Sequence, residues 1–242
     1  MDDIVKTLAR ISIFKNTPPP LLQNIAKQAH ASKHKKGKVL FIHGDKAQNY
    51  YIIKNGHVKL FRETLDGTQA TIDVLTKGDI FAHTLVLEEE TYPYSAEIVQ
   101  PGTIISLPLS DLREAIHTHN DLAVAMLQTV AHQYHQRERE LEHRSTQTTS
   151  QRIGCFLLRQ FQNQQNDSLA INLPYDKMLL AARLGMQPET FSRALSKLKK
   201  ETGIRTEGTW IYLETLDKLS SYACPACSGR FPCADLAQKS KE

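Results

Sequence analysis

The chain has 242 residues, of which 40% are hydrophobic and 23% are charged, so it can bury more than one core and has the size of two domains. No apolar run approaches the roughly 20 residues that span a bilayer, and residues 1–10 lack the basic start and apolar core of a signal peptide. The formal net charge is only +4, which excludes a chain that attracts nucleic acid by overall charge alone. We therefore expect a cytoplasmic protein with no membrane partner.

The first part of the chain predicts helices followed by a small β domain. Residues 4–13 and 18–29 have helical patterns, and the second begins at successive prolines. Short strands separated by turns that contain glycine favour a small antiparallel barrel or jelly roll. The first domain is expected to cover residues 1–109, with its β-rich segments at 39–45, 49–63, 65–75, 77–83 and 95–107.

A long helix is expected over residues 110–144, with Ser110 as its cap. Its apolar residues include Leu127, Tyr134 and Leu141, which lie seven apart as in a coiled coil. Pairing of two such helices in a homodimer explains this spacing. Packing of the helix against its own barrel is the alternative, because it would use the same residues.

Residues 177–196 place apolar and small residues where a helix-turn-helix needs them. Gly185 supplies the permissive backbone of the turn. An ordinary pair of packed amphipathic helices is the alternative interpretation. The residues expected to form the core on either side of the turn are Leu180, Ala181, Leu184, Met186, Phe191, Ala194 and Leu195.

The segment after these helices favours a winged helix-turn-helix over a plain hairpin. Residues 204–213 predict a β-ribbon that turns at Glu207-Gly208 and returns through Trp210 and Tyr212. We assign residues 145–219 to this domain. Double-stranded DNA is its expected partner because the region has a local basic face, formed by Arg193, Lys197, Lys199, Lys200 and Arg205.

The second helix of the motif is expected to read DNA. Arg193 suits guanine because a guanidinium can bond O6 and N7 together, and Glu189 can accept from a base amino group. Two simpler roles are open: Glu189 also suits the positive end of a helix, and Arg193 could contact only phosphate. The residues expected to contact DNA are Gln187, Glu189, Thr190, Ser192, Arg193 and Lys197.

The tail, residues 220–242, carries Cys224, Cys227 and Cys233. A C-x2-C pair brings two thiolates to one centre, and thiolates suit iron-sulfur clusters and zinc. Cys155 is a possible fourth ligand, although its place among apolar residues also suits simple packing. The spacing of the cysteines does not separate iron from zinc.

An enzyme is not expected. The Cys224–Cys227 pair superficially resembles a redox dithiol, but such pairs open a helix in a thioredoxin-like unit, whereas this one follows a winged helix. The sequence has no phosphate loop, nucleophile elbow or H-E-x-x-H motif.

Taken in order, these motifs resemble the CRP/FNR family of bacterial transcription regulators, and the resemblance covers nearly the whole chain. It implies an α+β architecture with a sensory, cyclic-nucleotide-binding-like β-barrel (jelly roll), a long dimerisation helix and a C-terminal winged helix-turn-helix. It also implies a homodimer that binds a palindromic operator and acts on RNA polymerase, as an activator or a repressor. Besides the helix-turn-helix, the matching segments are 36–45, 50–60, 66–68, 78–81 and 152–158.

Within the family, the recognition helix looks like that of the FNR branch. Glu189, Ser192 and Arg193 match its E-x-x-S-R pattern. This resemblance implies a TTGAT half-site, repeated as ATCAA after four bases.

The barrel departs from the cyclic-nucleotide binders of the family. In these relatives the segment that binds the cyclic phosphate ends with Arg-Ser followed by Ala, whereas this chain has Tyr94-Ser95-Ala96. The positive charge that would hold the phosphate is absent, so cyclic AMP is not expected to bind. Another effector or a haem is conceivable in the barrel. His43, His57 and His83 are nevertheless expected to be surface or hydrogen-bonding residues. An effector pocket would involve Gly78, Asp79, Tyr94 and Ser95.

In the FNR branch an oxygen-labile [4Fe-4S] cluster is held by cysteines, which some relatives place after the DNA-binding domain. The resemblance thus implies a regulator that responds to oxygen, nitric oxide or redox state, whose intact cluster favours the DNA-competent dimer. The alternatives are structural zinc or a thiol switch in the tail, with haem or a small effector sensed by the barrel. In some relatives a carboxylate of the partner's long helix completes the site, which directs attention to Glu138, Glu140 and Glu142. His143 and Asp235 are also possible ligands.

Overall fold

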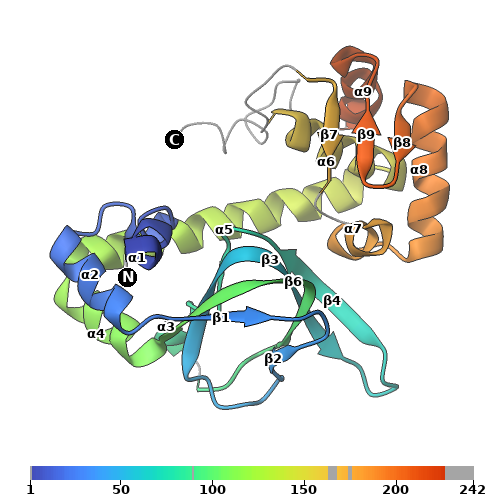
Figure 1. Cartoon of the computed structure of the whole chain (residues 1–242). Coiled ribbons are helices and arrows are strands. Elements are labelled where there is room, and N and C mark those ends of the chain that lie inside the picture. The colour runs from blue at the N-terminus through green and yellow to red at the C-terminus, as the bar shows by residue number, and fades with distance from the viewer. Residues whose placement is uncertain (1, 89, 163–167, 174–175, 227–242) are drawn as a thin grey trace. The chain divides into compact units, whose positions relative to one another are not determined.

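The computed structural model describes residues 2–88, 90–162, 168–173 and 176–226 (Figure 1). The chain divides into two compact units, Met1–His135 and Gln136–Glu242. None of the described helices is both long enough and apolar enough to cross a membrane.

The first unit contains a six-stranded antiparallel sheet that curls into a barrel (Figure 1). Strand order is β1-β6-β3-β4, with β2 also paired to β6 and β5 to β3. The strands are β1 His30–His34, β2 Val39–Phe41, β3 Asn49–Glu63, β4 Gln69–Leu75, β5 Ile80–Phe81 and β6 Ser95–Pro108. The predicted small antiparallel barrel is confirmed.

Strands β3 and β6 form the central strand pair of the barrel. Their register runs from Asn49 opposite Pro108 to Phe61 opposite Ser95. Inward-facing aliphatic side chains such as Ile52, Ile98 and Ile105 are fully buried, because alternate residues of a strand face the same side. The barrel therefore encloses a continuous apolar core.

Helices at both ends of the first unit pack on this core. The N-terminal ones are α1 (Asp2–Leu8), the 3-10 turn η1 (Ser12–Phe14) and α2 (Pro19–Lys27), and α3 (Leu85–Glu88) follows β5. A side-chain hydrogen bond of 3.2 Å joins the hydroxyls of Ser12 and Thr129. This contact ties η1 to the long helix α5.

The prediction of one continuous helix from Ser110 is wrong. The structure has α4 (Leu109–Thr118) and α5 (Asn120–Thr146), separated at His119, whose backbone is extended. Ser110 is not the cap; its hydroxyl donates to the Asp111 carboxylate. The helix ends because the Thr118 hydroxyl and the His119 ring both bond to carbonyls of the preceding turn, offering the backbone an alternative to helix.

One face of α5 is apolar and exposed. Leu127, Tyr134 and Leu141 are 65%, 62% and 64% exposed, and Val124 is 51% exposed. Leu122 and Met126, on another face of the helix, are buried in the core of the first unit instead. Packing among the described residues therefore leaves the heptad stripe uncovered.

The second unit combines helices with a three-stranded sheet of order β7-β9-β8 (Figure 1). Helix α6 packs against α8 and α9. Its Gly154 permits a close approach, since a Cβ there would lie only 3.0 Å from the Cβ of Ala223 on α9. The elements are α6 Thr149–Gln162, β7 Ala170–Asn172, α7 Lys177–Arg183, α8 Pro188–Thr202, β8 Arg205–Glu207, β9 Trp210–Tyr212, α9 Leu216–Ala223 and the 3-10 turn η2 Cys224–Ala226.

Candidate nucleic-acid interface and sensory pocket

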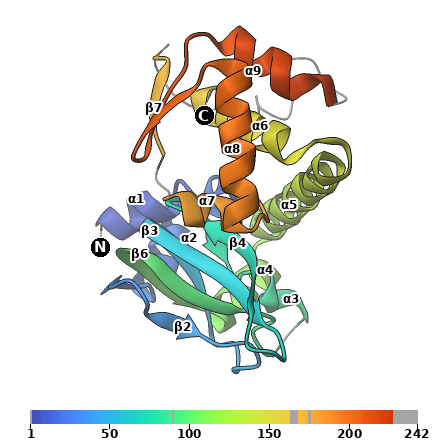
Figure 2. The same cartoon turned by 90° about the vertical axis from the view of Figure 1, so that its right-hand side faces the viewer.

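Helices α7 and α8 meet at a tight turn, with α7 lying at the N-terminal end of α8 (Figure 2). Asp176 caps α7 by accepting a 2.8 Å hydrogen bond from the Leu179 amide. Gly185 makes the turn with φ of +62°, a left-handed conformation that glycine adopts without steric cost. The predicted core is buried apart from Leu184, which is half-buried: Leu180, Ala181, Met186, Phe191, Ala194 and Leu195.

The side chains predicted to contact DNA lie outside this core. Thr190 is half-buried and the others are exposed: Gln187, Glu189, Ser192, Arg193 and Lys197. Gln187 precedes the first helical residue, and its side chain makes no capping hydrogen bond. The first turns of α8 therefore present amide, carboxylate, hydroxyl and guanidinium groups that are available to a ligand.

The wing follows α8. Gly203, with φ of +74°, ends the helix, and the ribbon then runs through β8 and β9. The predicted turn at Glu207-Gly208 is confirmed, since Glu207 ends β8 and β9 begins two residues after Gly208. The Lys199 ammonium donates to the Thr206 hydroxyl, which fastens the wing to α8.

The segment predicted to form an effector pocket is engaged in hydrogen bonds within the protein. The Tyr94 hydroxyl accepts from the Ala82 amide at 3.2 Å, and the Ser95 hydroxyl accepts from the His43 amide at 3.0 Å. The Asp79 carboxylate accepts from the Thr76 amide at 2.7 Å. At these three positions the sequence provides hydroxyl and carboxylate groups and no cation.

Aromatic rings fill the space beside Tyr94. The rings of Phe41 and Tyr92 stack with their centroids 3.7 Å apart, and Tyr51 stacks on Phe41 at 5.4 Å and on Phe81 at 5.2 Å. Stacked aromatic pairs contribute beyond the area that they bury. This cluster stabilises the barrel beside the predicted pocket.

His83 departs from its prediction as a surface or hydrogen-bonding residue. It is only 3% exposed, and neither ring nitrogen has a hydrogen-bond partner among the described residues. Burial lowers the pKa of His83 to about 4, so the ring is neutral at pH 7. His57 is also buried, whereas His43 is exposed and contacts the Arg62 guanidinium. Sequence alone offers no signal for the burial of a lone histidine.

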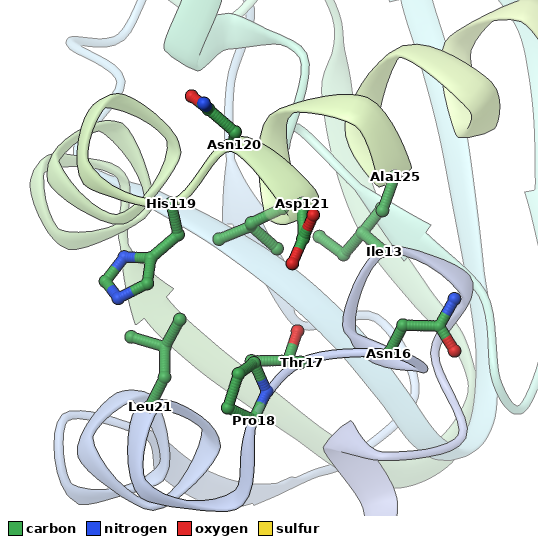
Figure 3. A pocket seen from close by; sticks show the side chains of 10 residues that line it. Ile13, Asn16, Thr17, Pro18, Leu21, His119, Asn120, Asp121 and Ala125 are labelled. Atoms are coloured by element: carbon green, nitrogen blue, oxygen red, sulfur yellow. The ribbon is translucent and has the colours of Figure 1, made fainter.

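A separate hollow of about 120 Å³ lies between the N-terminal helices and the start of α5 (Figure 3). Figure 3 shows His119 and Leu21 facing one another, while the Asp121 carboxylate points toward Thr17. The sequence patterns did not indicate this hollow, because the helix break that shapes it was not predicted. The hollow is lined by the Asp121 carboxylate, the His119 imidazole and apolar side chains, so it suits a small ligand that has one polar and one apolar part.

The cysteines lie only partly within the described residues. Cys224 begins η2 and Cys155 lies in α6, and both are half-buried. Cys227, Cys233 and Asp235 fall outside the described residues. Within residues 2–88, 90–162, 168–173 and 176–226, no three His, Cys, Asp or Glu side chains gather as metal ligands would.

Family models match both units. The cyclic nucleotide-binding domain matches residues 32–119, and the Crp-like helix-turn-helix domain matches residues 151–222. A solved structure of a candidate cAMP-binding regulatory protein from Silicibacter pomeroyi DSS-3 is 31% identical, has a TM-score of 0.65, and covers 92% of this chain and 99% of its own.

Two further relatives agree over most of the chain. The CRP-like cAMP-activated global transcriptional regulator of Mycobacterium tuberculosis is 23% identical over 92% of this chain and its own full length. FixK2 from Bradyrhizobium japonicum shares the fold, with a TM-score of 0.69 and 21% identity, over 80% of this chain and 96% of its own. With its barrel, long helix and winged helix-turn-helix, the chain belongs to the CRP/FNR family of DNA-binding transcription regulators.

Proposed function

We propose that this regulator is a cytoplasmic homodimer that reads a palindrome of TTGAT half-sites and acts on RNA polymerase in response to redox state, oxygen or nitric oxide. The observation that carries the proposal is the exposed face at the start of α8, formed by Glu189, Ser192 and Arg193. In the proposed complex Arg193 bonds O6 and N7 of the half-site guanine, and Glu189 accepts from a base amino group. Lys197, one turn further on, suits a backbone phosphate.

The stripe on α5 supports a dimer. Val124, Leu127, Tyr134 and Leu141 follow coiled-coil spacing and are left exposed by the single chain. A second copy covers such a stripe most simply, because identical heptads pair with one another. A twofold dimer also supplies two recognition helices for half-sites about 34 Å apart on DNA.

The cysteine tail is the proposed sensor. Its thiolates fit an iron-sulfur cluster or zinc, and a thiolate-bound cluster supplies sensitivity to oxygen and nitric oxide. We propose Cys155 as the fourth ligand beside Cys224, Cys227 and Cys233. The packing of α6 on α9 supports this choice, since Gly154 and Ala223 are in close contact and each directly precedes one of the cysteines.

A carboxylate from the partner's long helix is the competing fourth ligand. Glu138 and Glu140 are exposed on α5, and Glu142 is half-buried. Of the two other candidates, His143 is buried, which leaves its ring less accessible to a partner.

A sensor in the first unit is the second candidate function. It is favoured by the buried His83, whose ring nitrogens have no hydrogen-bond partner among the described residues. A neutral imidazole of this kind could ligate a haem iron or bond a small effector that enters the barrel. In that case the cysteine tail would hold structural zinc or act as a thiol switch.

The direct test is equilibrium binding, without oxygen, to a labelled duplex that contains TTGAT-N4-ATCAA. A scrambled duplex of equal length and composition is the control. We expect the palindrome to bind at least about 1000-fold more tightly, the lower end of typical specificity ratios. Equal affinity for the two duplexes would contradict the proposed half-site.

A further inference from the structure

Two arginines that the recognition pattern did not include converge on the turn of the helix-turn-helix. Arg144 comes from the last turn of α5 and Arg152 from the first turn of α6. An Arg144 Nη2 atom lies 3.2 Å from the position that a Cβ on Gly185 would occupy. Arg152 Nη1 donates to the Leu184 carbonyl at 3.4 Å. Two guanidinium groups thus lie against the adjacent turn residues Leu184 and Gly185.

The two charges are not neutralised within the described part of the chain. No ion pair of either arginine with a carboxylate is found there, and Arg152 Nε is buried without a hydrogen-bond partner. Burial, and then the charge of Arg144, lower the pKa of the Arg152 guanidinium. The Leu184 carbonyl satisfies only one of the five donors of Arg152. Two like charges held together are costly unless an anion joins them.

We propose that Arg144 and Arg152 together bind a backbone phosphate of the operator, an inference that rests on the proposed DNA-binding role. In a helix-turn-helix the first helix crosses the sugar-phosphate backbone, while the N-terminal end of the second helix enters the major groove. The turn between α7 and α8 joins these two positions, so a group beside Gly185 lies next to a phosphate that flanks the groove. Guanidinium forks match phosphate oxygens in pairs, so the two arginines complement this anion.

The salt dependence of DNA binding provides the test. Log K falls linearly with log salt, and each lost phosphate contact makes this negative slope shallower by about 0.9. A homodimer on the palindrome carries two copies of Arg144, so we expect Arg144→Gln to reduce the magnitude of the slope by about 1.8, and its affinity to fall about 12-fold less than that of the wild type between 50 and 200 mM salt. The loss of affinity should be equal for the TTGAT palindrome and for scrambled DNA. Arg144→Lys should restore most of the slope, since it keeps the charge.

Lys27→Gln is the matched control. Lys27 is an exposed cation in the last turn of α2, outside the winged helix-turn-helix, so the slope of this variant should equal that of the wild type. An unchanged slope in Arg144→Gln would overturn the inference. A lowered melting temperature with an unchanged slope would assign the arginines to holding the α7–α8 turn and would also overturn it.

The test separates this inference from the proposed function. A wild-type protein that does not prefer the palindrome refutes the TTGAT assignment alone, because the Arg144 slope can still be measured on scrambled DNA. A wild-type protein that prefers the palindrome, together with an unchanged slope in Arg144→Gln, refutes only the phosphate site.

Discussion

The backbone amide of Ala82 donates a 3.2 Å hydrogen bond to the phenol oxygen of Tyr94. Ala82 has φ of +60°, the left-handed conformation that is costly for a residue with a Cβ, and it is buried. The bond therefore gives a hydrogen-bond acceptor to a buried amide that water cannot reach, at a position where the backbone of the barrel is strained. It also engages Tyr94, the residue expected from the sequence resemblance to replace the arginine of cyclic-nucleotide binders.

This relationship predicts a stability effect for Tyr94→Phe. Removing the hydroxyl leaves the buried Ala82 amide without its acceptor, at a cost of about 1–3 kcal/mol in the free energy of unfolding. Urea denaturation at pH 7 measures this quantity. Tyr222→Phe, at a half-buried tyrosine of the second unit, is the control and should cost less than about 0.5 kcal/mol. Equal effects of the two substitutions would contradict the importance of the bond.

The missing cation at Tyr94 predicts no response to cyclic AMP. Millimolar cyclic AMP should leave the melting temperature and the affinity for DNA unchanged, because nothing at Gly78, Asp79, Tyr94 or Ser95 offers a positive charge to its phosphate. Inorganic phosphate at the same ionic strength is the control. A rise in melting temperature specific to cyclic AMP would show that another cation replaces the expected arginine.

The sequence predicts the second unit better than the first because its signals are local. Helix spacing and Gly185 locate the turn of the motif, and Gly208 locates the turn of the wing. The pattern does not reveal the break at His119, because the break depends on side-chain bonds to carbonyls and not on glycine or proline. The burial of His83 and the convergence of Arg144 and Arg152 arise from tertiary packing, which periodicity does not reveal.

The buried His83 predicts a pH dependence of stability. Burial lowers its pKa from 6.5 to about 4, so the folded state binds its proton less tightly than the unfolded state. This contribution to stability is present in full above pH 6.5 and is lost as the pH falls toward 4, on the order of 3 kcal/mol in total. Urea denaturation at pH 7.5 and at pH 5 measures the difference between the two free energies of unfolding.

A pair of variants isolates that effect. His83→Leu should remove this component of the pH dependence, whereas His117→Leu, at an exposed position on α4, should leave it unchanged. Identical pH profiles for wild type and His83→Leu would show that another group controls the acid sensitivity.

The exposed stripe on α5 predicts that Leu127→Glu weakens the dimer. The substitution places a charge from each chain in the proposed interface, so the dimer dissociation constant should rise at least about 30-fold, as for an interface hot spot. Sedimentation velocity over a range of concentrations measures it. Gln128→Glu adds the same charge at the neighbouring exposed residue, off the stripe, and should leave the dimer intact. A dimer that tolerates Leu127→Glu would place its interface elsewhere.

The tail predicts a bound metal in protein purified without oxygen. Iron with acid-labile sulfide, and a visible absorbance that bleaches in air, are expected for the wild type. Cys155→Ser and Cys224→Ser should each lose the metal while the protein keeps its fold by circular dichroism. Retention of iron by Cys155→Ser alone would favour a carboxylate as the fourth ligand. Zinc without iron would make the tail structural or thiol-based.

The most direct measurement for the whole account is the affinity of wild type and Arg193→Ala for the palindrome and for the same duplex with both half-site guanines replaced by adenine. A bidentate arginine–guanine contact is worth about 1–3 kcal/mol, so the wild type should prefer the palindrome by about 5- to 150-fold for each half-site. Arg193→Ala should bind both duplexes equally, and Lys197→Ala should weaken binding to both while keeping the preference. A preference for guanine that survives in Arg193→Ala would contradict the assignment of α8 as the helix that reads the operator through Arg193.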